Sequence, residues 1–272
     1  MVTIVETVSY YGFLVTIMGA AAYLLQTWLK RDWLPKIGLL LNAAGTLLML
    51  VAVIGRSRQV GRLPLNSVYE YLLVLSFAVL VAAFAIALKW KPYLVVGVML
   101  AVAAVLIGVS FGKTDLGGPL LPALQSNWRV SHVLTAIISY TAFALAFGVG
   151  VVYLIIIPGK TPEDVPAEKK ERAVFLEKLM FNSVVVGFIF LTLLIITGAV
   201  WAEEAWGSWW TWDPKETWAL VTWIIYAIYL HLRLRPAWRG KKGCYLSILG
   251  FVAVLFTLLG VTYIFGGLHS YG

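Results

Sequence analysis

Charged residues are scarce in this sequence, and their scarcity sets the class of protein. Only 12% of the 272 residues are Asp, Glu, Lys or Arg, whereas a soluble globular domain has about 25%. Hydrophobic residues make up 61% of the chain, and its mean hydropathy is +0.89. This composition excludes an ordinary soluble domain and indicates a membrane protein, in which spans of about 20 apolar residues are the units to count.

Cysteine is almost absent as well. The single residue, Cys244, cannot form an internal disulfide. One cysteine also excludes a Cys-x-x-Cys-His site, so the chain is not itself a c-type cytochrome. The first residues include no Lys or Arg, and the first apolar run is too long for a signal-peptide core. We therefore expect that run to remain as a helix.

Long stretches without Asp, Glu, Lys or Arg predict the membrane spans. They are 7–29, 37–55, 71–88, 92–112, 130–159, 179–202, 217–232 and 243–272. The shortest, 217–232, has a second signal at its start, because Asp213 suits a helix N-cap, Pro214 the first helical position and Glu216 the third. We predict an all-α, polytopic integral membrane protein with about eight transmembrane helices, forming a single domain over residues 1–272.

The distribution of Lys and Arg predicts the orientation of these helices. With both termini outside, 15 of the 21 basic residues fall on the inner side, as the positive-inside rule requires. This clustering between apolar runs also argues against nucleic acid as a partner, despite the net charge of +8, and favours contact with membrane lipid. The inner loop at about 158–178 mixes five basic and five acidic residues, and we expect a solvated connection or a short amphipathic helix there.

Residues 201–218, here called the Trp-rich segment, contain six of the chain's twelve tryptophans. One interpretation is an interfacial belt, in which indole rings lie among lipid headgroups, although a belt usually spreads over many helix ends. The other is a broad, flat and polarizable surface that suits a planar apolar ligand such as a porphyrin. Composition alone leaves a ligand platform and a belt or partner-docking surface both open.

The order of residues in this segment resembles a known signature. Residues 206–217, WGSWWTWDPKET, are similar to the WWD signature of membrane proteins that handle haem during cytochrome c maturation. Among their families the chain resembles CcsA, also called ResC, the smaller core component of the system II synthase. Residues 64–70 resemble that family's first outer loop, with Tyr71 where Ser is usual, and residues 267–272 resemble its C-terminus. The resemblance therefore covers nearly the whole chain.

The chain has three histidines, and two of them are predicted on the same face as the Trp-rich segment. His132 begins the fifth predicted helix and His269 follows the eighth. Neutral imidazole is a common axial ligand of haem iron, so one imidazole on each porphyrin face would complete the coordination while indoles hold the ring. A lone interfacial histidine is more often a hydrogen-bonded polar residue. The resemblance independently implies that His132 and His269 are the outer ligands.

His231 is predicted at the inner end of the seventh helix, beside Arg233 and Arg235. From the residues alone it suits contact with lipid headgroups or with the helix C-terminus. The resemblance implies instead a second, membrane-embedded haem site, with the other ligand supplied by a ResB-type subunit.

Four arginines are predicted on the outer side: Arg56, Arg58, Arg62 and Arg129. One hypothesis is that they pair with the propionates of haem through charge-assisted hydrogen bonds. The alternative is that they lie in solvated loops or contact lipid phosphates.

Together these features predict haem b as a bound substrate. The expected contacts are Trp206, Trp209, Trp210, Trp212 and Asp213 for the ring, and His132, His269 and His231 for iron. The resemblance implies that haem is presented at the outer face for thioether attachment to the Cys-x-x-Cys-His site of apocytochrome c, together with a ResB-type partner. It leaves open whether the chain also exports haem and whether it counts as an enzyme beyond being a subunit of cytochrome c synthase.

Three alternatives remain at this stage. A CcmC-type protein would deliver haem to a haem chaperone, although eight spans and the C-terminal His269 favour the synthase. An electron-transfer cytochrome b would pair its histidines within the bilayer, and here no two histidines share a predicted helix. A transporter would use the Trp-rich segment to gate a pore. The expected location is a bacterial plasma membrane, or else a thylakoid membrane, with the haem site facing outside.

Overall fold

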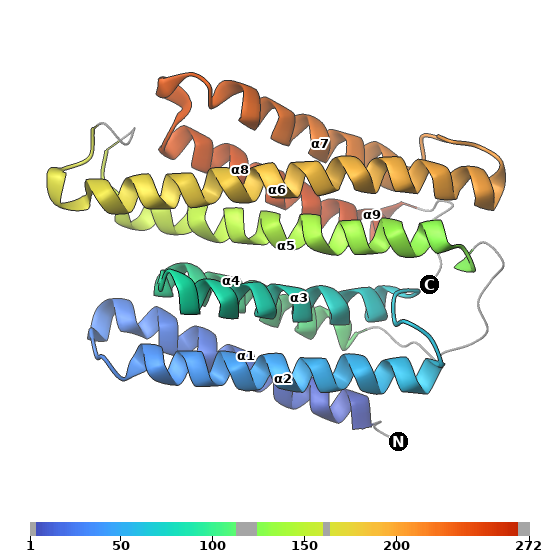
Figure 1. Ribbon diagram of the computed structural model, residues 1–272, viewed down its shortest axis with the longest axis horizontal. Coiled ribbons are helices and arrows are strands. Elements are labelled where there is room, and N and C mark those ends of the chain that lie inside the picture. The colour runs from blue at the N-terminus through green and yellow to red at the C-terminus, as the bar shows by residue number, and fades with distance from the viewer. Residues whose placement is uncertain (1–3, 113–123, 160–163, 266–272) are drawn as a thin grey trace. The chain divides into compact units, whose positions relative to one another are not determined.

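The computed structural model describes residues 4–112, 124–159 and 164–265, and within them every regular element is a helix (Figure 1). The elements are α1 Ile4–Leu29, α2 Leu34–Val60, α3 Val68–Lys89, α4 Tyr93–Ser110, α5 Asn127–Ile156, α6 Ala167–Trp206, α7 Pro214–Leu232, a 3-10 turn η3 Pro236–Trp238, α8 Lys241–Leu255, a π-helical turn η4 Phe256–Gly260 and α9 Val261–Ile264. The predicted all-α fold is confirmed.

Seven of the described helices are long and apolar enough to cross a bilayer. They are α1 to α6 and the continuous stretch Lys241–Gly260, formed by α8 and η4. Large apolar side chains such as Leu40 and Leu47 lie 70% and 61% exposed on the outside of α2, as expected where lipid is the solvent. The chain is therefore an integral membrane protein. The 19-residue α7 is not among these seven, and Trp, Tyr and Thr are interspersed with its aliphatic residues.

Helix boundaries follow local capping chemistry. Ser67 caps α3, Ser126 caps α5 and Asp213 caps α7, each by accepting a backbone N–H in the first turn. The predicted start of α7, with its capping box and Pro214, is confirmed. At the other end of a helix, Gly207 terminates α6 in the left-handed conformation, with φ of 71°.

The inner loop predicted at about 158–178 differs from expectation. Residues Ala167 to Lys178 are neither a connection nor a separate short helix, because they form the first turns of the 40-residue α6. Lys, Glu and Arg end an apolar run but are good helix formers, so they do not end the helix. At 1.5 Å per residue α6 is about 60 Å long, roughly twice the thickness of the hydrocarbon core.

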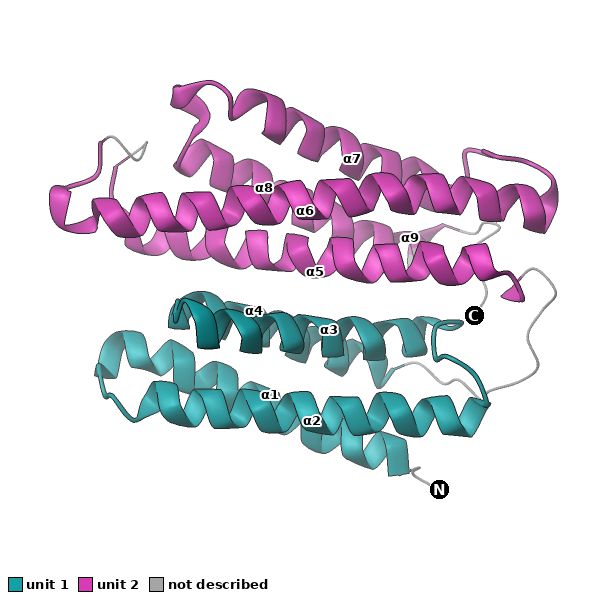
Figure 2. Cartoon of the chain, viewed as in Figure 1, with its two compact units in different colours: residues 1–120, 272 teal, residues 121–271 magenta. Residues whose placement is uncertain are grey.

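The helices form two compact units, residues 1–120 and 121–271 (Figure 2). In the first unit, α1 and α2 pack as an antiparallel pair through small residues that face larger ones. Gly12 lies against Met49, Thr16 against Gly45, and Gly38 against the ring of Tyr23. Small residues allow the two backbones to approach closely. In lipid the hydrophobic effect does not drive helices together, so this close packing supplies the attraction between them.

In the second unit, α5 packs against α6 and α8, and α7 packs against α6 and α8. The centre of this unit contains a stacked pair of rings, Phe143 and Tyr226, with centroids 3.7 Å apart and planes within 3°. Gly187 lies against Phe143, and Gly250 lies against Tyr226. Both rings are fully buried, so this pair is part of the packed interior where α5 meets α7.

Candidate functional site

One end of the second unit gathers His132 and the Trp-rich segment. Helices α5 and α6 lie side by side and run in opposite directions, so the start of α5 meets the end of α6 (Figure 1). His132 lies in the second turn of α5, and the last turns of α6 contain Trp201 and Trp206. The rest of the Trp-rich segment follows directly as the loop to α7. The structure thus brings together residues that are about 70 positions apart in the sequence.

His132 is oriented by a hydrogen bond to α6. Its ring Nδ1 lies 2.9 Å from the backbone carbonyl oxygen of Leu194. A carbonyl oxygen can only accept, so Nδ1 must be the donor. In the neutral imidazole this arrangement places the lone pair on Nε2, which is the form that can bind iron. The hydrogen bond therefore fixes both the direction of the ring and its tautomer.

Aromatic rings continue from His132 toward the loop. The His132 ring contacts Trp201, with centroids 5.8 Å apart and planes inclined by 39°. Trp201 meets Trp206 edge to face at 5.4 Å. Trp201 is only 4% exposed, so it supports the histidine from within the unit and does not offer a surface of its own. Trp201 was not among the predicted haem contacts, although its position in the Trp-rich segment could have indicated it.

The loop between α6 and α7 exposes indole rings on the surface of the protein. Trp210 and Trp212 meet edge to face at 5.7 Å, and Trp209 and Trp212 are 58% and 67% exposed. Exposed tryptophans of this size are costly in water and are enriched where a protein binds a ligand, a partner or the membrane interface. Of the predicted ring contacts, Trp209 and Trp212 are thus the accessible ones, while Trp206 and Trp210 are half-buried.

The carboxylate of Glu216 holds this loop in shape. Its Oε2 accepts hydrogen bonds from the backbone N–H of Thr211 at 2.8 Å, from the Thr211 hydroxyl at 3.2 Å and from the backbone N–H of Asp213 at 3.3 Å. Asp213 completes the capping box by accepting from the N–H of Lys215 at 2.9 Å. Between these anchors Trp212 has a φ of 59°, a left-handed conformation that a tryptophan rarely adopts.

We expect Glu216→Ala to loosen the loop without unfolding the protein. Loss of a helix cap costs about 1 kcal/mol, and here the change also releases the amides on both sides of Trp212. Hydrogen exchange should accelerate at Thr211 and Asp213 and stay unchanged in α5. Glu203→Ala, a neighbouring carboxylate outside the capping box, is the matched control; equal exchange in both variants would contradict this role of Glu216.

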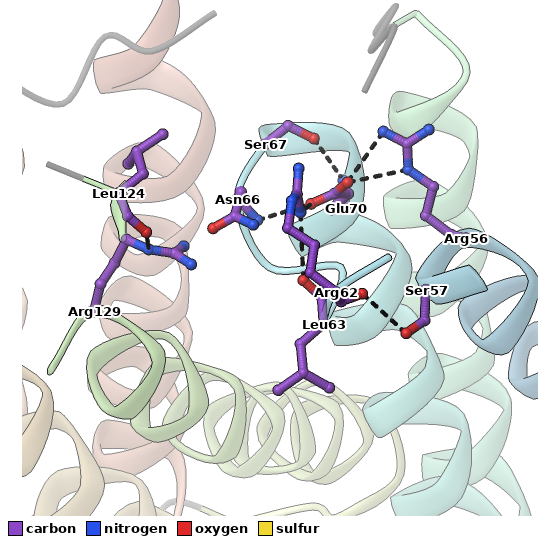
Figure 3. A network of polar contacts seen from close by, with 9 residues as sticks. All are labelled: Arg56, Ser57, Arg62, Leu63, Asn66, Ser67, Glu70, Leu124 and Arg129. Atoms are coloured by element: carbon purple, nitrogen blue, oxygen red, sulfur yellow. Dashed lines mark hydrogen bonds and ion pairs between the residues drawn. The ribbon is translucent and has the colours of Figure 1, made fainter. Parts of the chain in front are cut away.

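A polar contact ties the start of α5 to the end of α6 beside the site. The Ser126 hydroxyl, which caps α5 by accepting from the N–H of Trp128, donates to the carboxylate of Glu204. Close by in sequence, Arg129 is 6% exposed and its Nε donates to the carbonyl oxygen of Leu124 at 2.8 Å (Figure 3). Both interactions fix the beginning of α5, the helix that contains His132.

The other predicted ligands lie elsewhere. His231 is exposed in the last turn of α7, about 26 Å along the helix from Pro214 at 1.5 Å per residue, so it is not part of the His132 site. There Arg233 holds α7 against α6, because its guanidinium pairs with Glu177 and lies 4.0 Å over the ring of Phe181. His269 lies outside the described residues.

In the first unit, two of the arginines predicted on the outer side have a carboxylate partner that the sequence did not suggest. Glu70 is fully buried and pairs with Arg56 at 3.0 Å and with Arg62 at 2.8 Å (Figure 3). It also accepts the backbone N–H of Asn66 at 2.8 Å. The only signal in the sequence was one acid placed shortly after a group of arginines. The exposed Arg58 has no contact among those described for this network.

Comparison with known proteins gives a consistent result. Residues 65–269 match the family model described as cytochrome C assembly protein. The chain is 38% identical over 254 residues to the cytochrome c biogenesis protein CcsA of Chlamydomonas reinhardtii, covering 90% of this chain and 70% of that protein. It is 32% identical to CcsA of Synechococcus sp. (strain CC9902), covering 98% and 97%.

A solved structure, cytochrome c heme lyase CcmF, has a similar fold. The TM-score is 0.74 at 14% identity, and the match covers 93% of this chain. The chain spans 46% of the length of that structure, so the likeness concerns the arrangement of helices and not the activity of the longer protein.

Proposed function

Because the chain belongs to the CcsA family of cytochrome c biogenesis proteins, we propose that it binds haem at the Trp-rich end of its second unit and presents it to apocytochrome c. The observation that carries this proposal is the state of His132, whose Nδ1 donates to the Leu194 carbonyl and whose lone pair is therefore on Nε2. An iron ligand needs this tautomer, with the ring N–H held by an acceptor and the lone pair on the other nitrogen.

The surrounding residues fit haem as a substrate. The exposed rings of Trp209 and Trp212 offer the flat apolar area that a porphyrin face requires, and the loop that bears them is held by Glu216. His132 supplies one axial ligand and His269 is proposed as the other. Haem b is the proposed form, since its vinyl groups are the ones that react.

The chemistry expected of the bound haem is addition of two thiols across its two vinyl groups. Each Cys S–H of the Cys-x-x-Cys-His site adds to a C=C bond, with sulfur joining one carbon and hydrogen the other, so no external oxidant or reductant is consumed. The role of this chain is to hold the vinyl groups in place and exclude other orientations, and positioning of this kind can supply much of a rate enhancement.

A ResB-type membrane subunit is the proposed partner, and a second haem contact at His231 is proposed with it. His231 is exposed at the far end of α7 while Arg233 beside it is anchored to α6, so the imidazole is available on a fixed helix end. The proposed location is a bacterial plasma membrane or a thylakoid membrane with the Trp-rich end outside. Haem export through the complex would follow from the two sites and remains part of the proposal.

The test is reconstitution in cells that lack their own cytochrome c maturation. The chain is produced with its ResB-type partner and a reporter containing Cys-x-x-Cys-His, and covalent haem in the reporter is measured by haem staining after denaturation. We expect attachment only when the chain is present, and none to a reporter in which both cysteines are Ala. Haem bound to the complex but passed to a haem chaperone, with an unmodified reporter, would favour the CcmC-type alternative instead.

A further inference from the structure

Gly198 lies on α6 directly against the imidazole of His132. A Cβ placed on this glycine would be 2.7 Å from Nδ1, 2.9 Å from Cε1 and 3.8 Å from Cγ of the ring. All three nearest atoms thus belong to His132. Gly198 follows Leu194 by one helical turn, so the bare backbone of Gly198 and the carbonyl of Leu194 face the ring together.

We propose that Gly198 and the Leu194 carbonyl form a socket that sets the orientation and tautomer of His132, which makes Gly198 a positioning residue for the haem ligand. The proposal rests on the proposed function only for its link to haem, because the socket itself is present without a ligand. Because Gly198 has no side chain, the imidazole ring of His132 can lie against its backbone. The Leu194 oxygen accepts the N–H of the imidazole with its second lone pair.

Steric and hydrogen-bonding effects are linked at this position. Ordinary carbon contacts lie at 3.5 to 4.0 Å, so a methyl group on Gly198 would displace the ring by roughly 1 Å. The 2.9 Å bond to Leu194 cannot survive such a shift with good geometry. The hydroxyl of Thr197 donates to the Leu193 carbonyl oxygen at 2.7 Å and lies only 3.2 Å from the Leu194 oxygen, so the Leu194 oxygen has a second donor nearby when the ring is displaced.

The expected consequence is weaker iron ligation without loss of the ligand. Removal of a hydrogen-bond partner from a metal-binding histidine typically lowers metal affinity about 10- to 100-fold. Gly198→Ala should therefore reduce haem affinity by about that factor and raise the reduction potential of the bound haem, since an imidazole without its N–H partner is a weaker electron donor.

The experiment is a double-mutant cycle on the purified full chain with its partner. Gly198→Ala, His132→Ala and the double variant are compared by thermal unfolding without haem and by haem titration. Gly150→Ala is the matched control, because a Cβ on this α5 glycine meets nothing closer than 3.5 Å. We expect Gly198→Ala to lower the unfolding temperature in the wild-type background and to have no effect once His132 is Ala, since the methyl then has room.

The outcomes separate the two proposals. If Gly198→Ala is equally destabilising with and without the His132 side chain, or if it binds haem as the wild type does, the socket is wrong. If the cycle shows coupling in the haem-free protein but neither the wild type nor any variant binds haem, the socket stands and the proposed function fails. The test remains decisive if the Gly198→Ala protein folds poorly. We then expect the double variant with His132→Ala to fold normally again, and a double variant that still misfolds would contradict the proposal.

Discussion

Replacing His132 with alanine is expected to abolish haem attachment to the reporter. The change removes an axial ligand outright, so the loss should exceed the roughly 100-fold that loss of an outer hydrogen-bond partner can cost. The void left beside Trp201 and Gly198 has the shape of an imidazole ring, because those two residues line it. Free imidazole in the growth medium should therefore restore part of the attachment. The measurement is haem-stained reporter per amount of complex.

The rescue distinguishes ligation from folding. A variant that had merely unfolded would not respond to imidazole, whereas one that lacks only a ligand regains a low-spin visible spectrum along with activity. The same comparison on His269→Ala tests the second proposed ligand. Normal attachment in both variants would mean that the Trp-rich segment serves as an interaction surface, and the assignment of the site would be wrong.

Glu70→Ala is expected to be the most destabilising single change in the first unit. Glu70 is fully buried and is the carboxylate for both Arg56 and Arg62, so its loss leaves positive charge in a buried setting. Breaking a buried ion pair by removing one partner costs about 3 to 5 kcal/mol. Because the Asn66 amide also bonds to Glu70, the turn before α3 should loosen as well. Thermal unfolding of the detergent-purified protein measures the effect.

Two matched variants sharpen this prediction. Glu70→Gln keeps the shape and the acceptor oxygen but loses the charge, so its effect should be intermediate. Arg58→Ala, in the same group of arginines but exposed, should change stability by less than about 0.5 kcal/mol. A Glu70→Ala protein as stable as Arg58→Ala would show that the ion pairs contribute little to folding.

The sequence predicted helices well where the interactions that form them are local in the chain. Apolar runs must satisfy their backbone hydrogen bonds within lipid, so each became a helix, and the capping residues from Asp213 to Glu216 located the start of α7. The prediction for 158–178 was wrong in detail, because a charge count detects the end of an apolar surface and not the end of α6.

The sequence supplied the candidate residues of the site but not the contacts between them. The composition of the Trp-rich segment and the few histidines made His132 and the indoles candidates, whereas the contacts of His132 with α6 depend on which turn of α6 faces α5. Nothing in the local sequence distinguishes Gly198 from the other glycines of the chain, and nothing local marks the Leu194 carbonyl as an acceptor. The burial of Glu70 likewise could not be read from the sequence, because it arises only when α2 and α3 pack.

Trp212 lowers the stability of the loop that contains the proposed haem surface. Its left-handed backbone costs about 1 to 2 kcal/mol in any residue with a side chain other than Asn or Asp, and its ring is 67% exposed, so neither conformation nor burial favours tryptophan there. Glycine would relieve the strain, and Trp212→Gly should make the isolated protein more stable. Tryptophan is thus not the most stable residue for position 212. This is the expected pattern where a residue is retained for the contacts of its side chain and not for folding.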